Sequence, residues 1–317
     1  PELRQRLNDK LADLTGEEDG PSGPSGDLYD AVVNADSGSD NGSSPFATIQ
    51  AAVNFVTAGD VISVAPGTYP EQVEIDTKNI TIFGAGQDQT TIDATGKERG
   101  IAIEEDGVRI QGLTVDNAGK NVTSGEVEGI FVGDDTGFTD ADSDVVIRDV
   151  DITNISGGGS DKAAEGIHAK SYGEDKIDGL VIDDVTIDDV KQSTWGADGI
   201  KLQADVRNVT IRDSTIRNVE GSWAYGVVLT PSSVEPDIPA AVDFENSLIE
   251  NISALDFRGV GVGIDSESGK LEPATNGDDV ADPSELSFAG SSTIRKADFG
   301  IYDKNTDVSL SISPLPT

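Results

Sequence analysis

Polar side chains recur at fixed positions around a repeated pair, a glycine followed by an apolar residue. The pair begins at Gly100, Gly129, Gly166, Gly199, Gly226, Gly263 and Gly300. Aligned on it, Glu165 and Asp198 precede the glycine, His168 and Lys201 follow two positions later, and Lys170 and Gln203 four positions later. Alternation with apolar neighbours predicts that these six side chains point away from the core. Carboxylates one copy apart would lie at about 5 Å, a spacing suited to acid–nucleophile chemistry on a glycan or to a shared cation.

Three interpretations of this face are open. Glu165, Asp198 and His168, the only histidine of the chain, are acid–base candidates for cleaving a glycan. In the second interpretation the face binds a glycan without cleaving it, through Lys201, Lys170 and Gln203. The third interpretation is an ordinary solvated face, because acidic residues are common throughout this chain.

Aromatic residues gather just before two successive copies of the repeat. Trp195 precedes one copy, and Trp223 and Tyr225 precede the next. An indole face packs well on a sugar ring, and the same side chains serve as anchors in protein interfaces. We expect these three residues to bind a ligand or partner; the alternative is that they only cover a loop.

A run of acidic residues provides the one calcium-like spacing, at Asp140, Asp142 and Asp144. The glycine and the distal glutamate of an EF-hand loop are missing, so a solvated turn is the competing interpretation. We expect no cofactor, with Ca²⁺ or another cation as the alternative.

The elements that must position these residues follow from the period of the repeat, roughly 27 to 37 residues, which is typical of a stacked solenoid. A second pattern follows each glycine pair, as in Val108 to Asn117 and Val209 to Asn218. Two short alternating strands there meet at a central Asp, Asn or Gly, and an Asn or Asp ends the second strand. Stacked coils would let the terminal Asn side chains form a hydrogen-bonded ladder. These patterns predict an all-β, single-stranded parallel β-helix of about eight coils, with three short strands per coil.

The chain also resembles a known superfamily. Pro45 to Val53, followed by Gly59 to Tyr69, is similar to the opening of the right-handed parallel β-helix (pectate-lyase-like) domains, and Asn79–Ile82 and Asn208–Ile211 are typical of their coils. The resemblance covers about residues 28–312 and implies a right-handed solenoid. It implies no single activity, because lyases, hydrolases, esterases, epimerases, adhesins and viral tailspikes share this fold. The catalytic blocks of pectate lyases, polygalacturonases and alginate epimerases are not evident.

Domain boundaries follow from composition. Residues 1–15 carry Leu3, Leu7, Leu11 and Leu14 on one helical stripe, which predicts an anchor or oligomerisation helix. Residues 16–27 read as a flexible linker, and 28–317 as the β-helix domain. Within it, 44–58 is expected to be a capping helix over the open first coil, with Ser44 as N-cap and Pro45 in the first turn.

The charge of the chain, −37, excludes some partners. It has 59 acidic and 22 basic residues and no cysteine. Without a basic stripe we expect no nucleic-acid partner, and no apolar run is long enough for membrane insertion. Acidic residues spread along the whole chain favour a halophilic surface that molar salt screens.

These observations favour a display scaffold over an enzyme. We expect a structural and receptor- or glycan-recognition protein of a haloarchaeal virus, such as a tailspike, fibre or capsid turret. It would be located on the virion surface as a homo-oligomer, with a virion anchoring protein and a host cell-surface glycan or glycoprotein as partners. Its beginning at Pro1 without a recognisable signal peptide suits this expectation. The alternatives are a secreted haloarchaeal polysaccharide lyase or glycoside hydrolase, and an adhesin, located outside the cell or on the surface of a halophilic archaeon.

Overall fold

A computed structural model describes most of the proposed β-helix domain. The described residues are 29–36, 38–123, 125–133, 144–157, 162–171, 176–230, 240–256, 259–264, 285–297, 299–303 and 309–312. The predicted anchor helix with its four leucines, the linker 16–27, Asp140 and Asp142 lie outside these residues.

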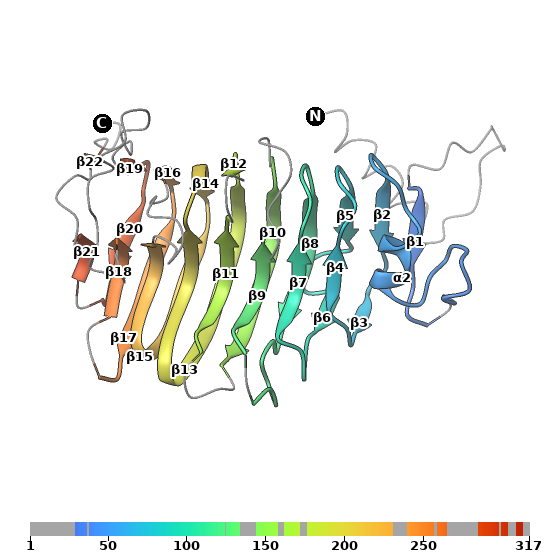
Figure 1. The fold of residues 1–317 in the computed structure, drawn as a ribbon, viewed down its shortest axis with the longest axis horizontal. Coiled ribbons are helices and arrows are strands. Elements are labelled where there is room, and N and C mark those ends of the chain that lie inside the picture. The colour runs from blue at the N-terminus through green and yellow to red at the C-terminus, as the bar shows by residue number, and fades with distance from the viewer. Residues whose placement is uncertain are drawn as a thin grey trace, which may run out of the picture.

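The strands stack in three parallel ladders, here called A, B and C (Figure 1). Ladder A comprises β1 (Ala31–Val33), β2 (Val61–Val64), β5 (Thr81–Gly84), the first parts of β8 (Arg109–Asp116), β10 (Val146–Ser156) and β13 (Val181–Gln203), then β14 (Val206–Arg212), β16 (Ala240–Glu245), β19 (Glu285–Ala289) and β22 (Ser309–Ile312), with β12 (Ile177–Asp178) beside β14. Ladder B comprises β3 (Gly67–Tyr69), β6 (Thr90–Asp93), the second parts of β8 and β10, the middle of β13, the first part of β15 (Thr215–Thr230), β17 (Leu248–Ala254) and β20 (Thr293–Arg295). Ladder C comprises β4 (Val73–Ile75), β7 (Arg99–Ile103), β9 (Val127–Val132), β11 (Ala164–Lys170), the ends of β13 and β15, β18 (Gly259–Ile264) and β21 (Phe299–Asp303). The predicted all-β parallel β-helix is confirmed, and each described coil from β2 to β21 contributes one strand segment to each ladder.

Residues in the left-handed backbone region turn the chain from one ladder to the next. Asp149, Asp184 and Asp213, with φ of 53°, 55° and 50°, lie between ladders A and B. Asn154 and Asn218 have φ of 56° and 57° in ladder B, at the end of the predicted pattern. Asn and Asp tolerate this conformation better than other residues with side chains. The corners that the sequence predicts are therefore confirmed.

The predicted ladder of Asn side chains is only partly formed. Asn251 donates to Asn218 at 3.1 Å, but Asn218 donates to Asp188 at 2.6 Å and Asn154 to Asp116 at 2.7 Å. Most of these amides thus reach a carboxylate of the preceding coil. A charged acceptor makes the stronger hydrogen bond, and this acid-rich chain supplies one beside the turn.

The glycine of the repeat is needed because ladder C packs closely against ladder B. A Cβ at Gly166 would lie 2.5 Å from Ile187 Cγ2 and 2.5 Å from the Gly199 carbonyl oxygen. The expected register is confirmed from Ile101 to Val227, but it is wrong at Gly263. Val227 pairs with Val262, which makes Gly261 the repeat glycine of that coil. In the run Gly259–Ile264 a glycine is followed by an apolar residue three times. Only the pairing of β18 with β15 shows which of these glycines is the one of the repeat.

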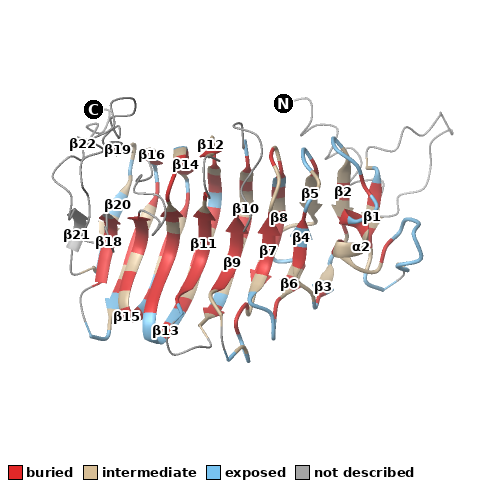
Figure 2. Cartoon of the chain, viewed as in Figure 1, coloured by how far each residue is buried: buried red, intermediate tan, exposed pale blue. Residues whose placement is uncertain are grey.

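The interior is a continuous column of Ile, Val, Leu and Ala side chains, which Figure 2 shows as buried residues passing through successive coils. One short helix, α2 (Ile49–Val53), buries Ile49, Ala52 and Val53 at the N-terminal end of this column. It covers only part of the predicted range 44–58. Its N-cap is Thr48, whose hydroxyl accepts from the Ala51 amide, so the prediction of Ser44 as N-cap is wrong. Within the described ranges, no helix has the length and apolar character of a membrane span.

Candidate functional site

The outer side of ladder C brings the predicted polar residues together. Strand pairing places Glu165 between Glu128 and Asp198, His168 between Phe131 and Lys201, and Lys170 beside Gln203. These are the columns that the sequence repeat predicts. Ile130, Ile167 and Ile200 point to the opposite side, into the core.

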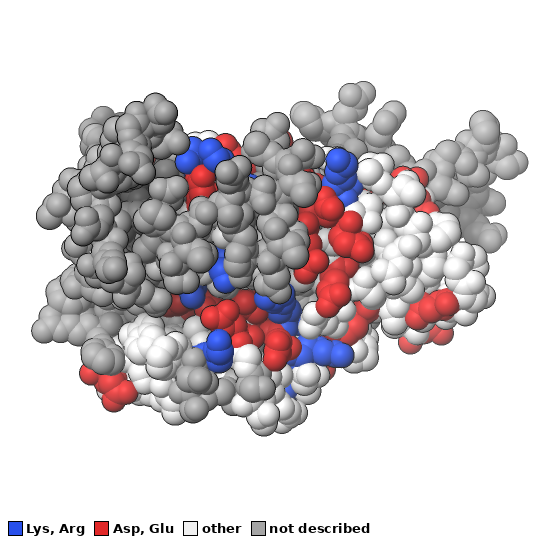
Figure 3. Space-filling model, in the orientation of Figure 1, with Lys and Arg blue, Asp and Glu red and all other residues white. Residues whose placement is uncertain are grey.

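The acidic and imidazole groups of this face are buried, which the sequence did not predict. The exposed fraction is 0% for Glu165, 1% for both Glu128 and His168, and 4% for Asp198. Their strands turn them away from the core, yet they are not part of a solvated surface. Figure 3 shows acidic and basic side chains gathered on the middle of the visible face of the molecule.

Glu128 and Glu165 each have a basic partner at one oxygen. Arg99 Nε donates to Glu128 Oε2 at 3.2 Å, and Lys201 Nζ donates to Glu165 Oε1 at 3.3 Å. The Arg99 guanidinium also lies 3.9 Å from the centre of the Phe131 ring, a cation–π contact. Phe131 in turn meets His168 edge to face at 5.6 Å between ring centres. The buried Phe131 ring therefore packs against both the Arg99 guanidinium and the His168 imidazole.

His168 has a defined orientation within this cluster. Its Nε2 lies 3.2 Å from Gln203 Oε1, and its Nδ1 lies 3.5 Å from Glu128 Oε1. Burial, together with the positive charge of Lys201, lowers the pKa of His168 to about 4. The imidazole is therefore neutral at neutral pH.

Burial acts on the carboxyl groups in the opposite direction. It raises the pKa of Glu128 to about 7, although Arg99 opposes this, and it also raises the pKa of Glu165 against the effect of Lys201. Glu128 is thus partly protonated at neutral pH, the state of a general acid. Donation to a substrate would require access, which a side chain exposed by 1% lacks in this conformation.

Three buried polar atoms of the cluster have no hydrogen-bond partner in the described part of the chain: Glu128 Oε1, Glu165 Oε2 and His168 Nδ1. Each such atom costs about 1–3 kcal/mol relative to one that is satisfied. A fold tolerates several such costs in one place chiefly where the groups have a function.

Two contributors to the cluster were missed from the sequence. Glu126 lies near Glu128 and His168, and Arg99 comes from β7, one coil before Glu128. The Glu-x-Glu spacing of 126 and 128 was a signal that could have been followed. Arg99 precedes Gly100 as Glu128 precedes Gly129, so the alignment on the repeat glycine could also have placed Arg99 beside Glu128.

The predicted aromatic residues form an edge beside this cluster, where ladder B turns into ladder C. Trp195 and Trp223 meet with ring centres 4.7 Å apart and planes at 63°. Trp223 pairs with Gly196, and Tyr225 pairs with Asp198, which connects the aromatic edge to the polar columns. Trp195 is 40% exposed, one of few large apolar side chains that the described residues present to solvent. We call Trp195, Trp223 and Tyr225 the aromatic edge.

Of the predicted cation loop, the structure describes only Asp144. Asp144 is exposed, and its backbone amide donates to the Asp178 carbonyl at 3.0 Å, a contact between neighbouring coils. The other two aspartates lie outside the described residues.

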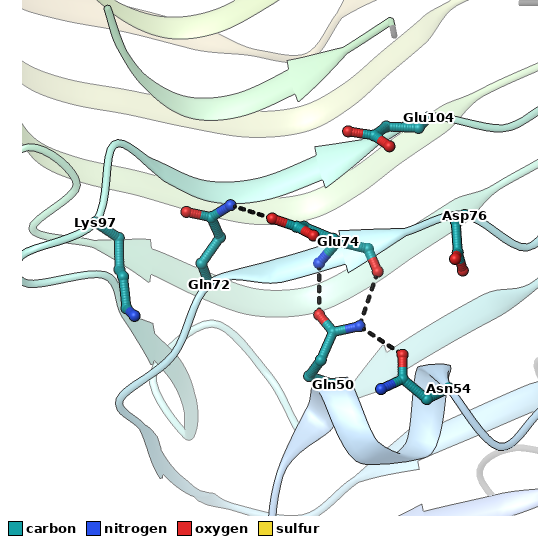
Figure 4. Close-up of a pocket in the computed structure, with 7 residues that line it drawn as sticks. All are labelled: Gln50, Asn54, Gln72, Glu74, Asp76, Lys97 and Glu104. Atoms are coloured by element: carbon teal, nitrogen blue, oxygen red, sulfur yellow. Dashed lines mark hydrogen bonds between the residues drawn. The ribbon is translucent and has the colours of Figure 1, made fainter. Parts of the chain in front are cut away.

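A separate polar hollow of about 470 Å³ lies near the N-terminal end, lined by side chains of α2, β4 and their surroundings (Figure 4). Its main hydrogen bonds are structural. The Gln50 side chain accepts from the Glu74 amide at 2.7 Å and donates to the Glu74 carbonyl at 3.0 Å. It thus pairs with the outer edge of β4 as a neighbouring strand would.

No protein-family model and no curated protein matches this sequence. Similar solved structures include a pectin methylesterase in complex with a hexasaccharide, at 14% identity over 87% of this chain and 81% of that chain, with a TM-score of 0.43. The rice weevil pectin methylesterase has 14% identity over 90% and 81% of the two chains and a TM-score of 0.43. A lacto-N-biosidase from Eubacterium ramulus has 11% identity over 89% and 68%, with a TM-score of 0.40. Values this low transfer no activity to this chain.

Proposed function

We propose that this protein is a carbohydrate-recognition β-helix that binds a glycan along the outer side of ladder C. The observation that carries the proposal is the pairing of an aromatic edge with a polar strand face directly beside it. Trp195 and Trp223 offer ring surface to solvent, and Lys170 and Gln203 on the same face are partly exposed. Sugar recognition uses this combination, because pyranose rings present apolar faces and hydroxyl edges.

The buried cluster suits a supporting role beneath such a surface. Glu165 holds Lys201, whose side chain is 12% exposed, and His168 holds the amide of Gln203. Side chains fixed in this way lose little conformational entropy when they bind a ligand. The acids and the imidazole thus position the residues that would contact the sugar.

Glycan binding in molar KCl tests this proposal, first by array screening and then by calorimetry with the best ligand. Removing one stacked aromatic ring by Trp195→Ala should weaken binding about 3- to 10-fold, the equivalent of about 0.5–1.5 kcal/mol. Phe55→Ala is the matched control, because Phe55 is an aromatic residue 48% exposed in the α2 region, away from the aromatic edge. Equal affinity for Trp195→Ala and Trp223→Ala variants and wild type would refute the proposed surface.

Glycan cleavage is the alternative, and the raised pKa of Glu128 beside Glu165 is the observation that favours it. Incubation with host and plant polysaccharides in molar salt should then release reducing ends or unsaturated sugars. Glu165→Gln and Asp198→Asn should abolish that activity. Absence of products, or activity that survives both substitutions, refutes cleavage.

The setting that we propose for this recognition is the surface of a halophilic virus, with the protein assembled as a homo-oligomer. The acid-rich composition and the predicted leucine stripe before the linker support it. Deleting residues 1–26 should lower the mass measured by light scattering, and antibodies against 29–317 should label purified virions. An unchanged mass would refute the oligomerisation helix, and unlabelled particles would refute the location.

A further inference from the structure

Three side chains near the middle of ladder C converge on one point. Glu128 of β9, His168 of β11 and Glu126, just before β9, each offer a ligand atom, and these atoms lie within 4.8 Å of one another. Two of the three side chains are almost completely buried.

The ring of His168 is oriented with its lone pair toward this point. Gln203 Oε1 can only accept a hydrogen bond, so Nε2 of His168 is the nitrogen that carries the proton. Nδ1 is then an acceptor, and it faces Glu128 Oε1, another acceptor, at 3.5 Å. Neither atom has a hydrogen-bond partner in the described part of the chain. Two buried acceptors that face each other repel unless a proton or a metal cation lies between them. Because burial raises the pKa of Glu128, a proton on Oε1 is the occupant with which a metal cation competes.

Two nearby basic side chains make hydrogen bonds to other carboxylate oxygens. Arg99 donates to the other oxygen of Glu128, and Lys201 donates to Glu165. These contacts hold Oε1 of Glu128 in place while they leave it directed at His168.

We propose that Glu126, Glu128 and His168 form a site for a divalent transition-metal ion such as Zn²⁺. Bonds of about 2.0–2.2 Å in a tetrahedral shell place two ligand atoms about 3.4 Å apart, close to the observed separation of Nδ1 and Oε1. The nitrogen ligand favours such an ion over Ca²⁺, which prefers oxygen. The hydrogen bond from Nε2 to Gln203 is the outer-shell contact that metal-bound histidines commonly make.

This site goes beyond the proposed glycan surface and does not depend on it. Its ligand atoms are buried below that surface, and the remaining coordination positions would be filled by water or by a further group. An ion there would compensate the carboxylates and fix β9 against β11. Glycan binding and metal binding can therefore fail separately.

The first test is calorimetric titration of ZnCl₂ into tag-free protein that has been dialysed against EDTA, in molar KCl. We expect one equivalent per chain, and at least about tenfold weaker binding for His168→Gln and for Glu128→Gln. Asp183→Asn is the matched control, because Asp183 is a buried carboxylate of ladder A, held by arginines, and should keep wild-type affinity. No binding by the wild-type protein, or equal binding by all variants, overturns the proposal.

A second measurement does not depend on the folding of any variant. His168 is the only histidine of the chain, so the imidazole nitrogen signal in pulsed paramagnetic resonance of the Cu²⁺-loaded wild-type protein identifies its ligation. We expect a remote imidazole nitrogen at one copper per chain. A copper signal that shows oxygen ligands and no imidazole nitrogen overturns the site.

Discussion

Replacing Gly166 by alanine tests both the close packing of ladder C on ladder B and the corrected register of the repeat. The new Cβ would lie 2.5 Å from Ile187 Cγ2 and 2.5 Å from the carbonyl oxygen of Gly199. The second contact is with backbone that is itself hydrogen-bonded into the ladder, so relief requires the coils to separate. Overpacking of this kind costs about 1–3 kcal/mol, and the entropy that alanine removes from the unfolded chain returns about 0.4–1 kcal/mol. We therefore expect Gly166→Ala to lower the free energy of unfolding by about 1–2 kcal/mol.

Gly263→Ala is the comparison that separates structure from sequence pattern. The repeat assigns Gly263 and Gly166 the same place, whereas strand pairing sets Gly263 opposite Val228, two residues beyond the repeat glycine. Its added Cβ would meet the Tyr225 ring, 2.4 Å from Cε1, and a ring at the end of a side chain can turn away. We expect Gly263→Ala to cost less than about 1 kcal/mol.

Urea unfolding in molar KCl, followed by tryptophan fluorescence, measures both variants. The only two tryptophans, Trp195 and Trp223, lie in the coils that follow Gly166 and report directly on this region. Equal midpoints for Gly166→Ala and wild type would refute the packing argument. Equal losses for Gly166→Ala and Gly263→Ala would refute the register.

The remaining predictions concern charge and the N-terminal cap. Hydrogen bonds from Arg212 and Arg148 lower the pKa of Asp183 in the folded protein. The ionised Asp183 therefore stabilises the fold at a pH above its unfolded-state pKa, and this stabilisation is lost as the pH falls through its folded-state pKa. Asp183→Asn should therefore be less stable than wild type at neutral pH and should lose less stability between about pH 5 and pH 3 in thermal melts. Gln50→Ala removes the two hydrogen bonds to the edge of β4, so hydrogen exchange at the Glu74 amide should become faster. Gln72→Ala removes a hydrogen bond to the Glu74 carboxylate instead and should leave the exchange rate of that amide unchanged. At a charge of −37, the melting temperature should rise from low to molar KCl; a constant value would contradict the halophilic interpretation.

The coil architecture was predictable because each coil repeats its physical requirements in sequence. Asp149 and Asp184 mark corners where the backbone takes positive φ, and Gly166 and Gly199 mark places where ladder C touches ladder B. Such requirements are local, so they select residue types at a regular spacing. The run from Gly259 to Ile264 shows the limit, because local pattern cannot choose among three equivalent glycines.

The candidate site was predictable in its membership but not in its environment. Repeat spacing placed Glu165, Asp198 and His168 in adjacent columns, and strand pairing agrees. Their burial could not be anticipated, since period-two alternation states only that a side chain points away from the core. The repeat does place Arg99 beside Glu128, because each precedes a repeat glycine, but the hydrogen bond between them follows only from the side-chain positions.

The repeat along the chain is enough to predict a parallel β-helix with corners, glycine contacts and polar columns, because these depend on backbone conformation and on a period that stacking repeats. The structure adds which polar atoms are buried, which basic groups hold them, and that Glu128 Oε1 and His168 Nδ1 face each other without a hydrogen-bond partner among the described residues. The reason is physical: desolvation and pairing depend on distances between coils and on what covers a face, and neither is encoded in the spacing of residues along the chain.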